Sequence, residues 1–204
     1  MPTEKNTLND GNEWESHLFP KQGIYLMRTG VKRMLRQYVD VDKTRMDFYE
    51  FGIFTSISIA THPLGQVDEV WCIDPTDGKA REMRGVAAFA KSERDSISPD
   101  EIDDAPIISW VETEKSTVDG LACRTYQQHI GGIETSHIRY VSIDSGFLVQ
   151  QERLLPCGKV KEVTKWTIEL LGPPPAEVFS IAHIQRELRD QAKKTKATKQ
   201  KGEK

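Results

Sequence analysis

The sequence predicts a mainly β domain of the α+β class: an antiparallel meander curved into an open half-barrel, with a few covering helices. From Gly23 to Leu171 the apolar runs are short, rich in Val, Ile, Thr, Tyr and Phe, and bounded by Gly, Pro or Asp. Several runs alternate apolar and polar residues, which gives a strand one apolar face. Such strands must curl around a helix, a second layer or an apolar cavity.

The first hairpin is predicted in "YVDVDKTRMDFYEF", with a two-residue turn at Asp42-Lys43. This register places Val39 opposite Met46 and Asp40 opposite Arg45. One face of the ribbon is then apolar and the other is polar and solvated. The apolar face collects Leu35, Val39, Val41, Met46 and Phe48, and the polar face collects Arg36, Asp40, Arg45 and Asp47.

Turn chemistry places the remaining elements. An alternating strand, "FTSISIATHP", ends at Pro63, and the next hairpin turns at Asp74 to Gly78. The stretch from Arg84 to Pro106 breaks the β pattern, with a short helix expected at 86–90 and a helix start at Ser98. Later strands are separated by Gly131-Gly132, Asp144-Ser145-Gly146 and Pro156-Cys157-Gly158.

We expect one folded domain over residues 23–181. Residues 1–22 form a polar, flexible lead-in, of which Trp14, Leu18 and Phe19 are expected to dock on the domain. Residues 182–204 hold a helix and a basic, disordered tail with six lysines from Lys193 onward. A tail that contacts an anionic surface or nucleic acid is the alternative to a merely solvated one.

Composition excludes some classes of function. The net charge of the 204 residues is -3, which argues against nucleic acid as the partner of the folded domain. No apolar run reaches the roughly 18 to 20 residues that span a bilayer, and the N-terminus has no signal-peptide pattern. A cytoplasmic protein and a processed exported protein both remain open.

The cysteines and histidines do not predict a metal or catalytic site. Cys72, Cys123 and Cys157 include no CxxC pair, so neither a disulfide scaffold nor a structural zinc site is expected. A two-residue turn at Gly131-Gly132 places His129 opposite Glu134, and puts His129 and His137 on opposite faces of the ribbon. Cys123 and His129 share a face but lie about 20 Å apart along a strand, too far for a nucleophile and its base. The same turn pairs Tyr126 with His137 and Arg124 with Arg139.

The sequence predicts a protein that is not an enzyme and needs no cofactor or metal. It has no nucleophile elbow, Walker loop, dinucleotide fingerprint, HExxH or EF-hand motif. The acidic run "DEIDD" at 100–104 has no histidine partner and is interpreted as a solvated loop. A hydrolase without a recognisable motif stays as an alternative.

The hairpin order resembles that of LolA-like proteins, a family of lipoprotein carriers, related sensing domains and lipoprotein-sorting homologues. The resemblance covers about Gly23 to Ile181. It rests on "YVDVDKTRMDFYEF", "EVWCIDPTDGKAREM", "TVDGLACRTYQQ" and "PPPAEVFSI". The family implies a curved half-barrel whose apolar face and covering helices enclose acyl chains. The sequence departs from the family in lacking an export signal and a lipid-attachment cysteine near its start, and in its lysine-rich end.

The resemblance implies non-enzymatic binding or transport of a lipid or lipoprotein in a periplasmic or other extracytoplasmic compartment. Another envelope protein is a further partner that the resemblance implies. A structural or protein-interaction domain with a filled core and a basic tail is the alternative. For each implied ligand contact, ordinary core packing is the competing interpretation. The implied apolar contacts are Leu35, Val39, Met46, Phe48, Trp71 and Trp166.

Overall fold

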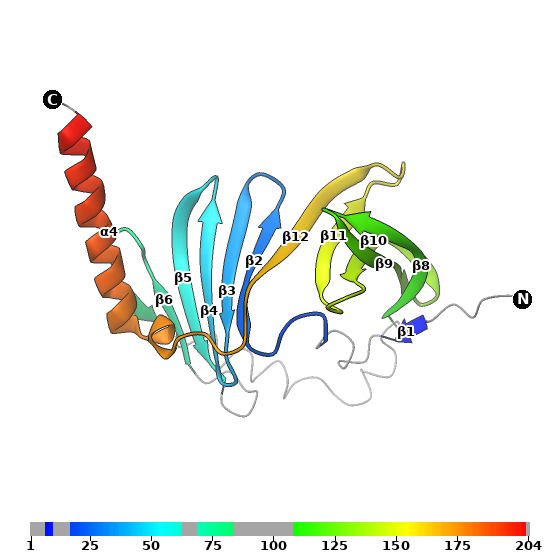
Figure 1. Ribbon diagram of the computed structural model, residues 1–204, viewed down its shortest axis with the longest axis horizontal. Coiled ribbons are helices and arrows are strands. Elements are labelled where there is room, and N and C mark those ends of the chain that lie inside the picture. Colours follow the sequence, from blue (N-terminus) through cyan, green and yellow to red (C-terminus); the bar gives the residue numbers. More distant parts are fainter. Residues whose placement is uncertain (1–6, 10–16, 63–68, 84–107, 203–204) are drawn as a thin grey trace, which may run out of the picture.

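A computed structural model describes residues 7–9, 17–62, 69–83 and 108–202. In this part of the chain, twelve antiparallel strands form one curved sheet in the order β1-β8-β9-β10-β11-β12-β2-β3-β4-β5-β6-β7 (Figure 1). The two edge strands, β1 and β7, do not pair with each other, so the sheet is open. The predicted fold class is confirmed. The strands are β1 (Thr7–Asn9), β2 (Gly23–Thr29), β3 (Arg33–Val39), β4 (Lys43–Glu50), β5 (Ile53–Thr61), β6 (Glu69–Ile73), β7 (Ala80–Glu82), β8 (Ile108–Val118), β9 (Leu121–Ile130), β10 (Ile133–Ser142), β11 (Leu148–Leu154) and β12 (Val160–Leu171).

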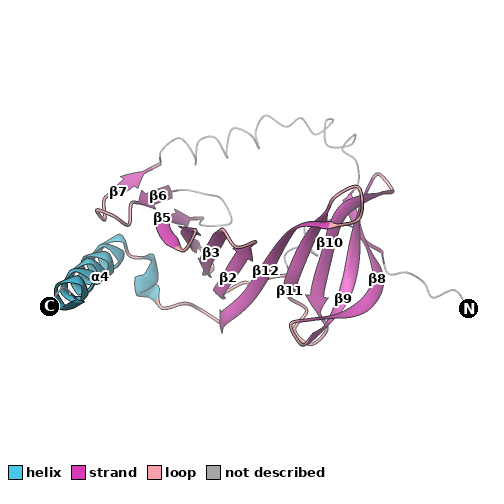
Figure 2. Cartoon of the chain, turned by 90° about the horizontal axis from the view of Figure 1, so that it is seen from above, coloured by secondary structure: helices cyan, strands magenta, loops and turns pink. Residues whose placement is uncertain are grey.

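Two meanders build the sheet rather than one. Strands β2 to β7 form the first and β8 to β12 the second, and each follows chain order. The long strand β12 joins them by pairing with β2, with Trp166 opposite Met27. Figure 2 shows the two halves from above, meeting at β12. The helices expected at 86–90 and from Ser98, the DEIDD run and Trp14 lie outside the described residues.

The β3–β4 hairpin turns one residue earlier than predicted. Its central residues are Val41 and Asp42, because the Asp40 N–H donates to the Lys43 C=O at 2.9 Å and the Asp40 Oδ1 accepts from the Val41 N–H at 2.8 Å. Val39 therefore pairs with Thr44, not Met46. The pairing moves by two residues, so the side chains of both strands stay on the predicted faces. The placement of Val41 on the apolar face was wrong, because the shifted turn leaves it exposed at the tip.

The predicted polar face is nevertheless the buried one. Asp47 accepts from the Arg45 Nε at 2.7 Å and from its Nη2 at 2.9 Å, and both side chains are almost fully buried. Arg45 Nη1 also donates to the Val178 C=O at 3.0 Å, in the 3-10 helix η2 (Ala176–Phe179). The expectation of a solvated face was wrong because these charged groups satisfy each other beneath η2. Burial raises the pKa of Asp47, and the Arg45 guanidinium opposes the rise.

Two separate clusters of buried side chains form the core. One cluster lies in the β8–β11 half and includes Trp110 and Tyr126, with Leu18 from the lead-in. The other includes Ile57 and Ile59 of β5, on the face that carries Arg45 and Asp47. The full clusters are Leu18, Trp110, Tyr126, Val141 and Leu148, and Ile57, Ile59, Ile73, Ile184 and Leu188.

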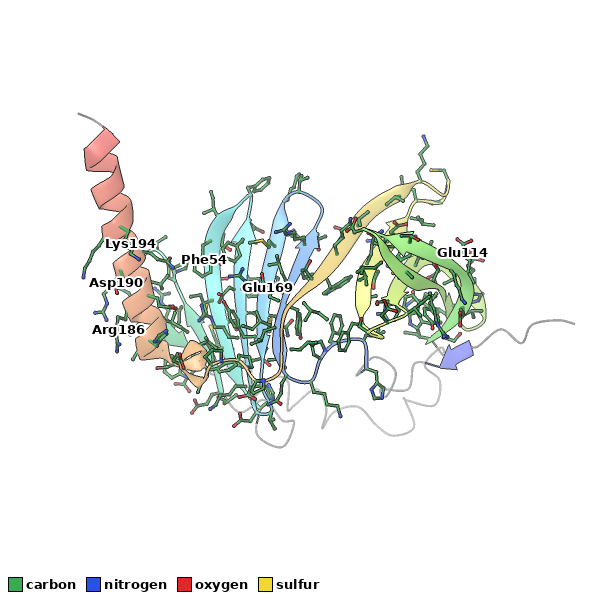
Figure 3. All side chains as sticks on the ribbon, viewed as in Figure 1. Phe54, Glu114, Glu169, Arg186, Asp190 and Lys194 are labelled. Atoms are coloured by element: carbon green, nitrogen blue, oxygen red, sulfur yellow. The ribbon has the colours of Figure 1, made fainter. Side chains whose placement is uncertain are left out.

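The C-terminal helix α4 (Ile181–Gly202) covers the second cluster. Ile184 and Leu188 lie one helical turn apart and belong to that cluster. Arg186, Asp190 and Lys194 point away from the sheet (Figure 3). The helical backbone continues to Gly202, further than the expected end near Lys194, because Lys, Gln and Ala are good helix formers. Among the described residues, no helix is long and apolar enough to cross a membrane.

Candidate ligand-binding groove

An open groove of about 660 Å³ lies where the two meanders meet. Its lining comes from β2, β3, β4 and β5 on one side and from β11 and β12 on the other. We call this face of the sheet the groove face, and the face that packs against α4 the helix face. The lining residues are Met27, Thr29, Arg33, Met34, Leu35, Phe48, Tyr49, Glu50, Thr55, Ser56, Gln151, Glu162, Thr164 and Trp166.

A straight row of side chains crosses the groove face. Trp166 of β12 is opposite Met27, Met27 is opposite Leu35, Leu35 is opposite Phe48, and Phe48 is opposite Ser56 of β5. Directly opposed residues project on the same side of a sheet. Four apolar side chains from four neighbouring strands therefore make a continuous strip, with a small serine at its end.

Polar groups lie on one side of this strip, toward the β2–β3 and β4–β5 turns. Thr29 and Thr164 hydrogen-bond across β2 and β12 at 3.1 Å. Arg33, at the start of β3, and Glu50, at the end of β4, are both exposed. Their Nε and Oε1 atoms lie 3.9 Å apart. An apolar strip with a few polar groups beside it is the usual composition of a site for an amphipathic ligand.

The lead-in covers the neighbouring row of the groove face. Phe19 stacks on Tyr25 with ring centroids 5.5 Å apart and is tilted against Trp166 at 5.9 Å. Burial raises the pKa of Tyr25 to about 12, so its hydroxyl stays neutral in the physiological range. Leu18 is buried as well, and its C=O accepts from the Leu148 N–H at 2.9 Å. The predicted docking of Leu18 and Phe19 is confirmed.

The structure brings together only some of the residues implied as ligand contacts. Leu35, Phe48 and Trp166 line the groove. Val39 and Met46 lie on the same face but nearer the β3–β4 turn, outside the lining. Trp71 lies on the helix face, opposite Ile59, and packs against the cluster under α4.

Sequence reasoning missed Met27 and Ser56, which complete the row. Met27 belongs to the segment "GIYLMRT", in which four consecutive apolar residues are consistent with either face. Only the pairing of β12 with β2 aligns Met27 with Trp166. No local signal in the sequence could have supplied that pairing.

The cysteine and histidine positions supply no metal site in the described part of the chain. No group of three or more His, Cys, Asp or Glu side chains there could hold a metal ion. His129 pairs with Glu134 as predicted, but a register shift beyond Glu134 places Tyr126 opposite Arg139 rather than His137. His129 and His137 still lie on opposite faces. Cys72, Cys123 and Cys157 are free thiols.

No family model matches the chain, and no curated protein matches its sequence. Solved structures do resemble it. The Pseudomonas aeruginosa MucA/MucB complex aligns at a TM-score of 0.46 with 10% identity, over 82% of this chain and 59% of the matched chain. A LolA superfamily protein from Nitrosomonas europaea aligns at a TM-score of 0.34 with 10% identity, over 83% of this chain and 94% of that chain.

A third similar structure is an outer membrane lipoprotein-sorting protein domain from Vibrio parahaemolyticus. Its TM-score is 0.32 with 7% identity, over 85% of this chain and 96% of that chain. These similar structures include a LolA superfamily protein and a lipoprotein-sorting domain. The chain spans less than two thirds of the matched MucB chain.

Proposed function

We propose that this protein binds an apolar or acylated ligand, a lipid or the acyl chains of a lipoprotein, in the groove, without catalysing a reaction. The observation that carries the proposal is the apolar row from Trp166 to Phe48 along the floor of an open groove. The groove volume of about 660 Å³ is within the range of roughly 300 to 1,000 Å³ usual for ligand sites. The proposed contacts are Met27, Leu35, Phe48 and Trp166.

The row is half-buried, and although Trp166 also packs against the first cluster, this incomplete burial favours a carrier over a domain with a filled core. A filled core would bury Met46, Phe48 and Trp166, but the side chains of all three are only partly buried. We propose Val39 and Met46 as further contacts for a longer ligand, since they extend the groove face toward the β3–β4 turn. Trp71 is left out because it packs under α4. We propose in addition that the protein carries out this binding in an extracytoplasmic compartment.

Organic extraction followed by mass spectrometry tests the proposal. The full chain is purified without detergent, beside a mock preparation, and is extracted before and after incubation with lipid vesicles. We expect a lipid or fatty acid near one equivalent per chain. A blank extract in both conditions contradicts the proposal.

A matched pair of variants locates the binding. Ser56→Phe places an aromatic ring at the end of the row, and we expect it to reduce the extracted lipid severalfold by filling the groove. Thr167→Phe places the same ring on the helix face of β12, opposite Leu26, and should leave the yield unchanged. Equal yields from the two variants would place the ligand elsewhere.

A further inference from the structure

Three hairpin turns lie side by side at one end of the strands. They join β2 to β3, β4 to β5 and β11 to β12, and Figure 1 shows them along the upper rim of the sheet. We call residues 29–33, 50–53 and 155–163 the hairpin rim. The groove reaches this rim, because Thr29, Arg33 and Glu162 also line an adjoining recess of about 580 Å³.

Large apolar side chains stand at the tips of the rim. Val31 is 95% exposed, Phe51 is 70% exposed and Ile53 is 67% exposed, and Val160 is half exposed. Single exposed apolar residues are common on protein surfaces. Several at neighbouring tips, however, form an apolar surface that water solvates poorly.

The backbone at Phe51 is held in an unfavourable conformation. Its φ is +51°, and Gly52 follows with φ +77°, as in a two-residue turn with both residues left-handed. Such turns favour Asn-Gly or Asp-Gly, and a bulky aromatic residue there is an outlier. The exposed Phe51 ring has no core to fill, so core packing does not explain it. Strained, exposed positions of this kind point to a functional contact.

Hydrogen bonds tie the tips together. The Phe51 N–H donates to the Lys32 C=O at 2.7 Å, and the Gly30 N–H donates to the Val163 C=O at 3.0 Å. The Lys32 Nζ lies 5.7 Å from the centre of the Phe51 ring. Backbone bonds therefore join the bases of neighbouring tips, and a cation lies beside the Phe51 ring.

The charge of the rim differs in sign from that of the chain. Lys32, Arg33, Lys159 and Lys161 outnumber Glu50 and Glu162, so four positive less two negative charges leave +2, whereas the whole chain carries -3. Apolar tips among basic side chains suit a surface that is apolar inside and anionic outside.

We propose that the hairpin rim docks on an anionic phospholipid bilayer, with Val31, Phe51 and Ile53 entering the interface and the basic residues contacting lipid headgroups. The groove then opens toward the membrane surface through the recess that it shares with the rim. Docking does not require that the groove hold a lipid, so each proposal can be tested independently of the other.

Co-sedimentation of the full chain with vesicles tests the docking. We expect binding to phosphatidylcholine vesicles that contain phosphatidylglycerol, and weaker, salt-insensitive binding to phosphatidylcholine alone. Phe51→Asn should weaken binding by on the order of tenfold, because the apolar area entering the interface falls. Asn adopts the left-handed conformation readily, so this variant should fold at least as well as the parent.

The matched control is Val41→Ser, to be compared with Val31→Ser. Val41 is 77% exposed at the tip of the β3–β4 turn, at the opposite end of the strands, and its loss should not change binding. Replacing Lys32 and Lys161 by Gln should weaken binding to the anionic vesicles by about fivefold for each residue. Binding that is unaffected by Phe51→Asn and Val31→Ser overturns the proposal, as does failure of the parent chain to bind anionic vesicles.

The groove variant separates the two proposals. Ser56→Phe should lose extracted lipid and keep vesicle binding, because Ser56 lies outside the rim. A parent chain that sediments with vesicles but yields no extractable lipid would leave the docking intact and contradict the groove. The reverse result would leave the groove intact and contradict the docking.

Discussion

At the scale of single residues, the buried ion pair of Arg45 and Asp47 controls how η2 meets the sheet. Asp47 neutralises the guanidinium, accepts from the Tyr38 hydroxyl at 3.3 Å, and leaves Arg45 Nη1 free to donate to Val178. The Arg45 guanidinium also lies 4.8 Å from the centre of the Tyr38 ring. One polar network therefore connects β3, β4 and η2.

Asp47→Asn should lower the free energy of unfolding by about 3 to 5 kcal/mol, because it leaves a buried guanidinium without a counter-charge. Urea denaturation followed by circular dichroism measures the change. The control is Asp190→Asn, which removes the exposed pair with Lys193 at 3.6 Å and should cost less than about 1 kcal/mol. Similar losses in both variants would mean that the buried pair is not stabilising.

His137 should make stability depend on pH. Burial first, and then the charges of Arg153 and Arg139, lower the pKa of His137 below its ordinary value of 6.5. Just below pH 6.5 the unfolded chain binds a proton that the folded chain does not, so the free energy of unfolding falls as pH decreases through this range. His137→Gln should reduce that slope. Denaturant titrations above and below pH 6.5 measure it, and an unchanged slope would contradict the assignment.

At the scale of elements, α4 is attached to the sheet by one short apolar stripe. Ile184 is 1% exposed and Leu188 is 9% exposed. The Gln185 side chain donates to the Gly78 C=O at 2.8 Å, which adds one polar contact to the β6–β7 turn. The docking of α4 therefore depends on its first two turns.

Ile184→Ala should lower the free energy of unfolding by about 2 to 5 kcal/mol, since it removes a fully buried side chain and leaves a cavity. Chemical denaturation measures the loss. Arg186→Ala, on the face of α4 that points away from the sheet, is the matched control and should change stability by less than about 0.5 kcal/mol. A small effect of Ile184→Ala would show that α4 is not anchored by this cluster.

At the scale of the whole molecule, the sheet has two cores joined by the pairing of β12 with β2. Residues of the two clusters come from different meanders, and α4 contributes only to one of them. Local opening at one end of the sheet can then proceed without the other.

Hydrogen exchange should reveal this division. In Ile184→Ala, the amides of β5 around Ile57 should exchange faster than in the parent chain, while those of β9 around Tyr126 should change much less. Exchange followed by mass spectrometry of peptides resolves the two strands. An equal loss of protection in β5 and β9 would show that the molecule opens as a single unit.

The sequence by itself determined the class of fold, most turns and the side of the sheet on which many side chains lie. These features depend on local chemistry: alternation along "MLRQYV" and "RMDFYE", and Gly, Pro or Asp at reversals. The shift of the β3–β4 turn is local too. It depends on the Asp40 side chain, which accepts a hydrogen bond from the Val41 N–H, and composition does not predict that bond.

The tertiary structure alone decided which face is buried, and where. Thr29 and Thr164 are 135 residues apart in sequence and hydrogen-bonded across β2 and β12, and no local pattern encodes that meeting. It aligns Trp166 with Met27 and Leu35 in the groove. The placement of η2 likewise buries Arg45 and Asp47, because a polar face can be buried once its charges are paired. The placement of α4 covers the cluster against which the half-buried Trp71 packs.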